Sequence, residues 1–360
     1  MIMTNIKSTI RTYLKIIFFC ILFILIIDII FGKKILNLIN PNVTQYYDNE
    51  IYHHDLKKNI NIENEWEPGK KYNTCTDASG FRIGCSSKEL NNKNFDIAFI
   101  GDSFTEGVGV EYEKTFVGLI SKNKSNLKIA NLGVTSYSPS IYLVKFQELL
   151  KNNYKFKRLI IYIDISDIYD EGKKYRIHND RIYSMKNIYL ENFQTFISKN
   201  FPLTSTSVKN LKNNLTSPFQ TKVRVMKWKG CTYLEKCYER ANWTYNDNKF
   251  EKFAIDKSLA TVEKIYQLAK KNNIKISIGI YPWPGMLLYD SEKSKQVQIW
   301  KEFCENKCEF FFNNFPEFYE YSKKNSPQET IEKFYIKGDV HFNANGHTII
   351  ANNFIKNFKN

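Results

Sequence analysis

The chain has 360 residues, of which 43% are hydrophobic, so it can bury one large core or two smaller ones. It carries 52 Lys+Arg against 37 Asp+Glu, a formal net charge of +15. The basic residues do not gather into an arm and no nucleic-acid-binding signature is present, so we expect no nucleic-acid partner. The excess charge is typical either of a solvated lysine surface or of a protein that works beside an anionic surface.

A long apolar run lies near the N-terminus. Tyr13–Gly32 has about the length of a helix that crosses a bilayer, and no small-residue cleavage site follows it, which favours an uncleaved anchor over a removed signal peptide. Asp28 lies near its outer end, where the carboxylate could reach the interface. The run's uninterrupted apolar centre, Ile16–Ile27, is flanked by basic residues, which favour a cytoplasmic N-terminus: Lys7, Arg11 and Lys15 before it, Lys33 and Lys34 after it. We predict a cytoplasmic tail at 1–12, a transmembrane anchor at 13–32 and a periplasmic, extracytoplasmic body.

The cysteines agree with a location outside the cytoplasm. Apart from Cys20 they form three close pairs, Cys75/Cys85, Cys231/Cys237 and Cys304/Cys308. Each pair could close a short loop as a disulfide in an oxidising compartment. Zinc binding is the alternative, but the CxxC spacing and nearby histidines that would support it are missing. Disulfides are favoured, and pairing between the close pairs stays open.

The body of the chain alternates apolar and amphipathic runs. Residues 33–74 are polar and aromatic with weak periodicity, which predicts a stalk that leads into a domain at 75–360. There, runs typical of buried strands (96–101, 127–132, 158–165, 275–281, 308–312) alternate with runs typical of helices (113–122, 140–152, 255–272, 293–304, 346–358). This order predicts an α/β fold, a three-layer αβα sandwich with a mostly parallel sheet. Residues 172–255 break the alternation and are interpreted as an insertion or cap.

A serine and a histidine stand out as candidates for chemistry. The first predicted strand ends in Gly-Asp-Ser, with Ser103 following the apolar run directly. Of the five histidines, His341 follows Asp339 at a spacing of two, in a loop that leads into the last helix. If Asp339 holds one imidazole nitrogen, the other is free to take a proton from a serine. The alternative for Ser103 is a helix cap, and His347, inside the helix start, is expected to be structural.

Two segments carry a resemblance to a known family. GDSF at 101–104 together with DVHFNANGH at 339–347 resembles the SGNH/GDSL hydrolases, over about residues 75–360. The resemblance implies a flavodoxin-like fold in which Ser103 is the nucleophile, His341 the general base and Asp339 the acid that orients it. The Asp-x-His spacing, shorter than the Asp-x-x-His of many members, resembles a branch among envelope-polysaccharide acetylation proteins.

The same resemblance assigns an oxyanion hole with one departure from the family. Gly133, in the sequence IANLG, resembles the block whose backbone N–H joins that of Ser103. Where the family has Gly-x-Asn-Asp, this chain has Asp164-Ile-Ser166-Asp167, so Ser166 takes the place of the oxyanion asparagine. Either two backbone N–H donors are enough to stabilise the oxyanion, or Asn131 supplies a third donor, or the rate of the reaction is low.

The remaining support residues and ligands follow from the same blocks. Asp102, Asn131 and Asp167 are candidates for supporting the site. The acidic run at 164–171 lacks the ligand spacing of a hard-cation loop, so we expect no metal, and the resemblance implies no organic cofactor. Trp283 and Trp300 are either core residues or part of a sugar-stacking wall.

The expected function is a membrane-anchored serine esterase or O-acyltransferase. It would act, through an acyl-enzyme, on acyl esters, O-acetyl above all, of a cell-envelope or exported glycan; lipids and peptidoglycan-like substrates stay open. The alternative is a catalytically weak or inactive SGNH-fold protein that binds glycan among envelope-glycan assembly proteins. Ser166 favours this alternative, whereas the intact Ser103, Asp339 and His341 favour the enzyme.

Overall fold

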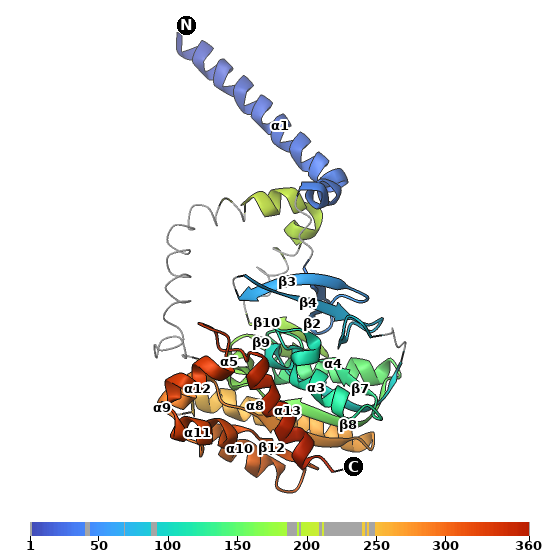
Figure 1. The fold of residues 1–360 in the computed structure, drawn as a ribbon. Helices are drawn as coiled ribbons and strands as arrows, with labels where there is room; N and C mark the ends of the chain where they lie inside the picture. The colour runs from blue at the N-terminus through green and yellow to red at the C-terminus, as the bar shows by residue number, and fades with distance from the viewer. Residues whose placement is uncertain are drawn as a thin grey trace. The chain divides into compact units, whose positions relative to one another are not determined.

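The computed structural model describes residues 2–39, 44–67, 69–87, 92–185, 193, 196–208, 211, 240–241, 243–244 and 249–359. The chain divides into two units, Met1–Val43 with Lys186–Arg224, and Thr44–Met185 with Val225–Asn360. The larger unit holds the sheets and the candidate site. In the smaller unit, helix α1 (Ile2–Ile39) contains one stretch, Ile10–Leu36, that is long and apolar enough to span a membrane, with a mean hydropathy of 3.0 (Figure 1).

The larger unit is built on a five-stranded parallel sheet. Its order is β12-β11-β8-β6-β7, and every neighbouring pair is parallel. The strands are β6 (Asn94–Ile100), β7 (Ile129–Asn131), β8 (Lys155–Tyr162), β11 (Lys275–Ile280) and β12 (Phe311–Asn313). The last four residues of β6, from Ile97 to Ile100, are all fully buried. Strands buried on both faces read as continuous apolar runs, which is why the sequence located them.

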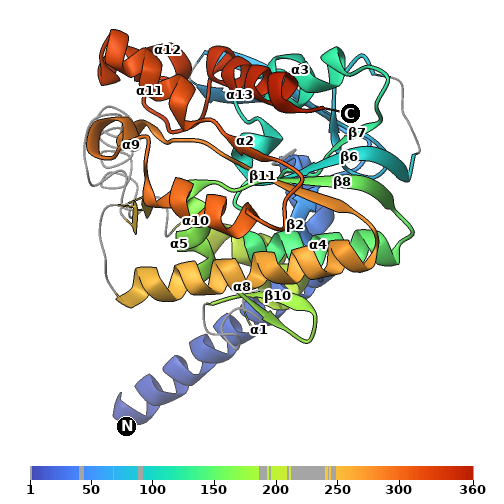
Figure 2. The ribbon, with the colours of Figure 1, turned by 90° about the horizontal axis from the view of Figure 1, so that it is seen from below.

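Helices cover both faces of this sheet, as Figure 2 shows. One face carries α4 (Pro139–Lys151), α5 (Ile165–Lys173), α8 (Lys249–Lys271) and α10 (Lys295–Cys304). The other carries α3 (Phe116–Asn123) and α13 (Ala344–Asn357), with α11 (Phe315–Lys324) and α12 (Pro327–Phe334) beside them. The smaller elements are η1 (Tyr112–Lys114) and α9 (Pro284–Tyr289). The predicted three-layer αβα fold is therefore confirmed.

The strand order changes direction at β6. From β6 the chain crosses to β7 on one side and then returns to β8 on the other. In open parallel sheets such a reversal opens a crevice at the carboxyl ends of the strands, where ligands bind. The Gly-Asp-Ser segment follows β6 directly, so the fold places it at this crevice.

The structure differs from the sequence prediction in the segment that was expected to be a stalk. Within residues 33–74, β1 (Tyr46–Asn49) pairs with β2 (His53–Leu56), and β3 (Asn61–Glu67) pairs with β4 (Lys70–Thr76), which continues to β5 (Arg82–Ile83). These two small antiparallel sheets belong to the larger unit. A buried ion pair, Lys145 Nζ to Asp55 Oδ1 at 2.8 Å, ties β2 to α4. Helix α1 also extends beyond the predicted 13–32.

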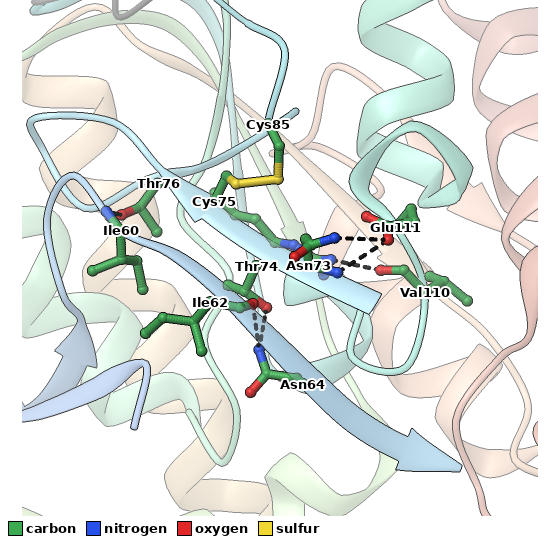
Figure 3. Close-up of a disulfide and its surroundings, with 11 residues drawn as sticks. Ile60, Ile62, Asn64, Asn73, Thr74, Cys75, Thr76, Cys85, Val110 and Glu111 are labelled. Atoms are coloured by element: carbon green, nitrogen blue, oxygen red, sulfur yellow. Dashed lines mark hydrogen bonds between the residues drawn. A yellow bond between two sulfur atoms is a disulfide. The ribbon is translucent and has the colours of Figure 1, made fainter. Parts of the chain in front are cut away.

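Two of the three expected disulfides are present. Cys75 on β4 is bonded to Cys85, just after β5, and Cys304 at the end of α10 is bonded to Cys308. Figure 3 shows the first of these, with Asn73 on the same strand turned towards Glu111, whose carboxylate accepts from the Asn73 N–H at 3.1 Å. Cys20 is a free thiol. The pair Cys231/Cys237 lies outside the described residues.

The predicted insertion at 172–255 is divided between the two units. It begins in the last turn of α5 and continues as a hairpin of β9 (Tyr175–His178) and β10 (Arg181–Ser184) in the larger unit. Residues 186–224 group with α1 instead. The final part of the range is already α8, which begins at Lys249 rather than at 255.

Candidate active site

Ser103 begins a short helix directly behind the central strand. Gly101 and Asp102 form the turn between β6 and α2 (Ser103–Glu106), and the Asp102 side chain caps the helix by accepting from the Phe104 N–H at 3.0 Å. A Cβ on Gly101 would stand 2.8 Å from the Tyr162 carbonyl oxygen, so only glycine fits this turn. Ser103 is the first residue of α2, and only 6% of it is exposed. The capping role considered for Ser103 is thus taken by Asp102.

The loop before α13 brings the histidine to this serine. His341 Nε2 lies 2.7 Å from Ser103 Oγ, across 238 residues of sequence. Its other ring nitrogen, Nδ1, bonds Asp339 Oδ1, which also accepts the His341 backbone N–H at 3.0 Å. The loop is held by a bond from the Ile336 N–H to the His341 carbonyl oxygen at 2.8 Å and turns at Gly338, whose φ is 75°. Serine, imidazole and carboxylate therefore form one chain of hydrogen bonds.

The charges in this chain of bonds are set by burial and by one another. Burial acts to raise the pKa of Asp339, but His341, through its charge and two hydrogen bonds, and the Trp66 N–H lower it to about 2. Burial acts to lower the pKa of His341, but Asp339, with Asp102 and Asp164, raises it above its ordinary value. Asp339 is thus a carboxylate at neutral pH that favours the imidazolium form of His341.

Trp66, on β3, is a member of the site that the sequence analysis missed. Its Nε1–H donates to Asp339 Oδ2 at 3.1 Å, and its ring meets the His341 ring edge-on with centroids 5.1 Å apart. The Phe104 ring lies against the same imidazole at 4.8 Å. Trp66 lies 273 positions before Asp339, in a segment with no catalytic motif. Only the alternation of polar and apolar residues along β3 could have indicated that this segment forms a strand.

Three buried carboxyl groups lie beside the serine. Asp102, Asp164 and Asp167 each offer an oxygen within 4.8 Å of the others. Asp102 Oδ2 accepts from Ser103 Oγ at 3.1 Å, and Asp167 accepts from Tyr142 at 2.7 Å. Burial, reinforced by the Asp164 charge, raises the pKa of Asp102 to about 8, and burial with the Asp102 charge raises that of Asp167 well above its ordinary value. Burial therefore favours the protonated forms of Asp102 and Asp167.

These carboxyl groups are bound mainly to protein donors. Asp164 accepts from Ser166 and from Trp283 Nε1, the latter at 2.5 Å, and the Asp164 N–H donates to Asp167 Oδ2 at 2.9 Å. Together they are the group of carboxylates in the described part of the chain that could hold a metal ion. We assign them no metal, since five of their six oxygens serve as caps or hydrogen-bond acceptors and only Asp167 Oδ1 is buried without a partner.

The layout of these elements decides the fold type. A GDS turn follows the central parallel strand, an Asp-x-His loop precedes the last helix, and the two meet at the carboxyl end of the sheet. The fold is a flavodoxin-like αβα sandwich, and both motifs lie where the resemblance to the SGNH/GDSL hydrolases predicts them. The prediction of this fold from two short motifs agrees with the arrangement of the chain itself.

Comparisons with known proteins give remote similarities only. No protein-family model and no curated protein matches the chain. Similar solved structures include a lipolytic protein of the G-D-S-L family from Veillonella parvula, with 12% identity, a TM-score of 0.40 and coverage of 73% of this chain and 97% of that one. An acetylxylan esterase from Geobacillus stearothermophilus shows 13% identity, a TM-score of 0.41 and coverage of 74% and 95%.

Two donor groups that the resemblance assigns to an oxyanion hole, the Gly133 N–H and the Ser166 hydroxyl, are hydrogen-bonded to other residues in this structure. The Gly133 N–H donates to Asn131 Oδ1 at 3.0 Å, and Asn131 in turn donates to the Thr105 carbonyl oxygen at 2.9 Å. A Cβ on Gly133 would stand 2.5 Å from the Glu106 nitrogen, so glycine lets this loop touch α2. The Ser166 hydroxyl donates to Asp164. Gly133 and Ser166 therefore lie close to the nucleophile helix or the acidic cluster, with their donors engaged.

The other residues singled out in the sequence are structural. His347 is 1% exposed, and burial lowers its pKa to about 3. Trp300 is fully buried in the core, and Trp283 is 3% exposed with its N–H on Asp164. Neither tryptophan presents a face for sugar stacking, so the core interpretation holds for both.

Proposed function

We propose that this SGNH-fold protein is a membrane-anchored serine esterase, with Ser103 as nucleophile, His341 as general base and Asp339 as the acid that orients it. The observation that carries the proposal is the hydrogen-bonded chain from Ser103 Oγ through His341 to Asp339, with 2.7 Å between Oγ and Nε2. A serine of ordinary pKa becomes a nucleophile when a neighbouring base removes its proton during attack.

The proposed reaction has two half-reactions. Ser103 Oγ attacks the ester carbonyl carbon while His341 Nε2 takes the hydroxyl proton, and Asp339 stabilises the imidazolium that forms. His341 then gives this proton to the leaving alcohol oxygen as the carbon–oxygen bond breaks, which leaves an acyl group on Ser103. In the second half-reaction water or a sugar hydroxyl loses a proton to His341 and attacks the acyl carbon. The bond from this carbon to Ser103 Oγ then breaks, and His341 returns the proton to Oγ.

The oxyanion would be stabilised by backbone and side-chain donors around Ser103. The Ser103 N–H is at the first position of α2, where helix geometry provides no intrahelical acceptor. Gly133 and Ser166 are the proposed further donors, and each would have to turn from its present acceptor, Asn131 or Asp164. Removing one such donor costs about 10²–10³ in rate, so a two-donor site predicts a slow enzyme.

The proposed substrate is an O-acyl ester, O-acetyl above all, on a cell-envelope or exported glycan. The Asp-x-His spacing and the extracytoplasmic location proposed for the body support this substrate. Helix α1 as a membrane anchor and disulfides typical of an oxidising compartment support the location. The acyl group would go to water or to a sugar hydroxyl.

The test is ester turnover by the full-length chain in detergent. We expect hydrolysis of p-nitrophenyl acetate, and we expect Ser103→Ala and His341→Ala each to lower kcat/KM by about 10³-fold or more. Asn345→Ala, an exposed position at the start of α13, is the matched control and should keep full activity. Equal activity in wild type and Ser103→Ala would refute the serine mechanism.

The second candidate is a glycan-binding protein that has lost catalysis, and the engaged Ser166 hydroxyl favours it. A serine-reactive fluorophosphonate separates the two. Two results together indicate a transferase: the fluorophosphonate labels Ser103, and the unlabelled protein transfers an acyl group only when an acceptor glycan is added. Absence of both labelling and turnover, together with glycan binding, indicates the binding protein.

A further inference from the structure

A buried carboxylate interrupts the apolar surface of α1. Asp28 is 1% exposed, whereas most apolar side chains of the span around it are more than half exposed. Asp28 Oδ1 accepts the Leu203 N–H at 2.8 Å, and Oδ2 accepts the Thr204 N–H at 2.7 Å. These donors belong to the first turn of a helical segment at 202–208, whose N–H groups have no intrahelical acceptor. An unpaired carboxylate in a membrane span is costly, and here two backbone donors offset that cost.

Gly32, one helical turn after Asp28, completes the contact. A Cβ at Gly32 would stand 2.9 Å from Pro202 Cγ and 2.1 Å from Asp28 Oδ1. The close approach of residues 202–204 to α1 therefore depends on the absence of a side chain at Gly32 as well as on the Asp28 carboxylate. Figure 1 shows this yellow-green segment beside the end of α1. The contact is specific, which makes residues 196–208 a fixed attachment to the C-terminal end of the span.

The attached segment presents apolar side chains to the outside. The largest exposed ones are Phe193 (60%), Phe196 (57%), Val208 (61%) and Leu211 (61%). Within residues 196–208 the single charged residue is Lys199, and the remaining polar residues are serines, threonines and one asparagine. Phe196 also contacts Phe201, with ring centroids 6.5 Å apart. Helices that lie in a lipid interface have this composition, in which phenylalanine and leucine occur with lysine and acidic residues are absent.

We propose that residues 196–208 rest in the lipid interface at the C-terminal end of α1, with Phe196 and Val208, and the nearby Phe193 and Leu211, among the acyl chains. This inference rests on the anchor in the proposed function. A bilayer is the occupant because Asp28 and Gly32 fix the segment to the span itself. Exposed Lys33 and Lys34 follow at the same end, so basic groups accompany the apolar ones, as in segments that bind anionic lipid. The insertion thus gives the protein a second membrane contact.

The test places a tryptophan in the segment and measures its contact with lipid. Full-length Phe196→Trp is reconstituted into vesicles of phosphatidylcholine and phosphatidylglycerol, with either plain or brominated acyl chains, and compared with wild type. We expect the added emission to be blue-shifted and to lose roughly half of its intensity in brominated vesicles, because the ring lies at the acyl boundary. Tyr289→Trp, an exposed aromatic position on α9 of the other unit, is the matched control and should keep its emission.

A third variant separates this proposal from the anchor. Phe19→Trp, within the span of α1, should be quenched if α1 crosses the bilayer. Quenching at Phe19→Trp without quenching at Phe196→Trp overturns the interfacial segment and leaves the anchor intact. No quenching at either position overturns both. If the Phe196→Trp emission is the same in plain and brominated vesicles but changes with the protein-to-lipid ratio, the segment contacts a second copy of the chain. This result also overturns the proposal.

The role of Asp28 is tested in the same vesicles. Asp28→Ala in the Phe196→Trp background removes both acceptors and is expected to reduce the quenching at least about twofold, since the segment loses its attachment to α1. Asp28→Asn keeps one acceptor and is expected to fall between the two. Quenching that is equal in all three backgrounds would show that Asp28 does not hold the segment and would overturn that step.

Discussion

At the scale of single residues, Trp66 controls how strongly Asp339 attracts His341. Its Nε1–H donates a hydrogen bond to Asp339 Oδ2 and partly neutralises the carboxylate, while Asp339 Oδ1 bonds the His341 imidazole. Because the neutral imidazole is the base, activity should rise with pH through the pKa of His341, which lies above its ordinary 6.5. In Trp66→Phe the carboxylate loses a donor, the imidazolium is favoured further, and this rise should move up by about half to one pH unit. The measurement is kcat/KM for p-nitrophenyl acetate against pH.

The direction of that shift separates positioning from packing. Trp66→His keeps a ring N–H and is expected to restore part of the wild-type profile, whereas a loss of ring packing would lower kcat/KM at every pH without moving the rise. Thermal unfolding of each variant reports the packing cost independently. An unmoved profile in Trp66→Phe, with the melting temperature unchanged, would contradict this role.

Asp102 links the nucleophile turn to stability at alkaline pH. Burial and the Asp164 charge raise the pKa of Asp102 to about 8, so the folded protein holds a proton that the unfolded chain loses near pH 4. Between these values the folded state binds more protons than the unfolded state, and the free energy of unfolding falls as pH rises. Asp102→Asn keeps the cap acceptor for Phe104 and removes this titration. We expect its melting temperature to exceed that of wild type at about pH 9, but to differ little at about pH 3, below the pKa of the unfolded chain.

Asp96→Asn is the control for that comparison. Asp96 is on β6, the strand that Asp102 follows, but hydrogen bonds from Lys128 and Lys157 lower its pKa, so its stabilising ionisation is complete well below neutral pH. Its replacement should lower stability slightly and equally across the alkaline range. If Asp102→Asn shows the same flat difference, the raised pKa of Asp102 is refuted.

At the scale of elements, the small sheets of residues 46–83 hold the helix that carries the nucleophile. Arg82, on β5 and 1% exposed, donates to the carbonyl oxygens of Glu106 and Gly107 and, at 2.6 Å, to that of Val110. A cation is favourable at these carbonyl groups, which end α2. Gln45 and Tyr46 hold the same helix through Glu106, at 3.1 and 2.9 Å. A short helix of four residues has little stability of its own, so these contacts fix Ser103.

Arg82→Met tests this dependence. We expect it to lower the free energy of unfolding by about 3 kcal/mol, because buried carbonyl groups lose a charged donor. The value of kcat should fall more than KM rises, since the position of Ser103 changes and the substrate surface does not. Lys71→Met, a mostly exposed ion-pair residue on neighbouring β4, is the matched control and should change stability by less than about 1 kcal/mol. Urea unfolding and steady-state kinetics measure both effects, and equal results for the two variants would contradict the role of Arg82.

The elements also show which features a sequence can reveal. The parallel strands were predictable because burial on both faces makes runs such as Ile97–Ile100 uniformly apolar. Ser103 and His341 were singled out because each stands in a short local motif, Gly-Asp-Ser or Asp-x-His. The strands β1–β5 were missed because they mix polar and aromatic residues and are only partly buried, with β3 burying fully only Ile62. Trp66 and Arg82 act across long sequence separations, and no local pattern encodes such contacts.

At the scale of the whole molecule, the fold joins a membrane-length helix to a disulfide-bearing body. Three basic residues precede the apolar centre of the span at Ile16–Ile27 and two follow it, which favours an N-terminus in the cytoplasm. With that orientation the body folds in an oxidising compartment, where Cys75–Cys85 and Cys304–Cys308 form. The opposite orientation would leave these cysteines reduced, so the state of the thiols in the cell reports the topology of the chain.

Alkylation of cell-derived protein measures that state. Cells are quenched in acid and denatured with a thiol-reactive polyethylene glycol, so each free cysteine adds one increment of mass on a gel. We expect the chain to gain the increment for Cys20 and to gain those for the paired cysteines only after reduction. The matched control is the chain lacking residues 1–32, which stays in the cytoplasm, where glutathione keeps thiols reduced. A native chain that is labelled at the paired cysteines as fully as this control would place the body in the cytoplasm, and the glycan ester proposed as substrate would then be out of its reach.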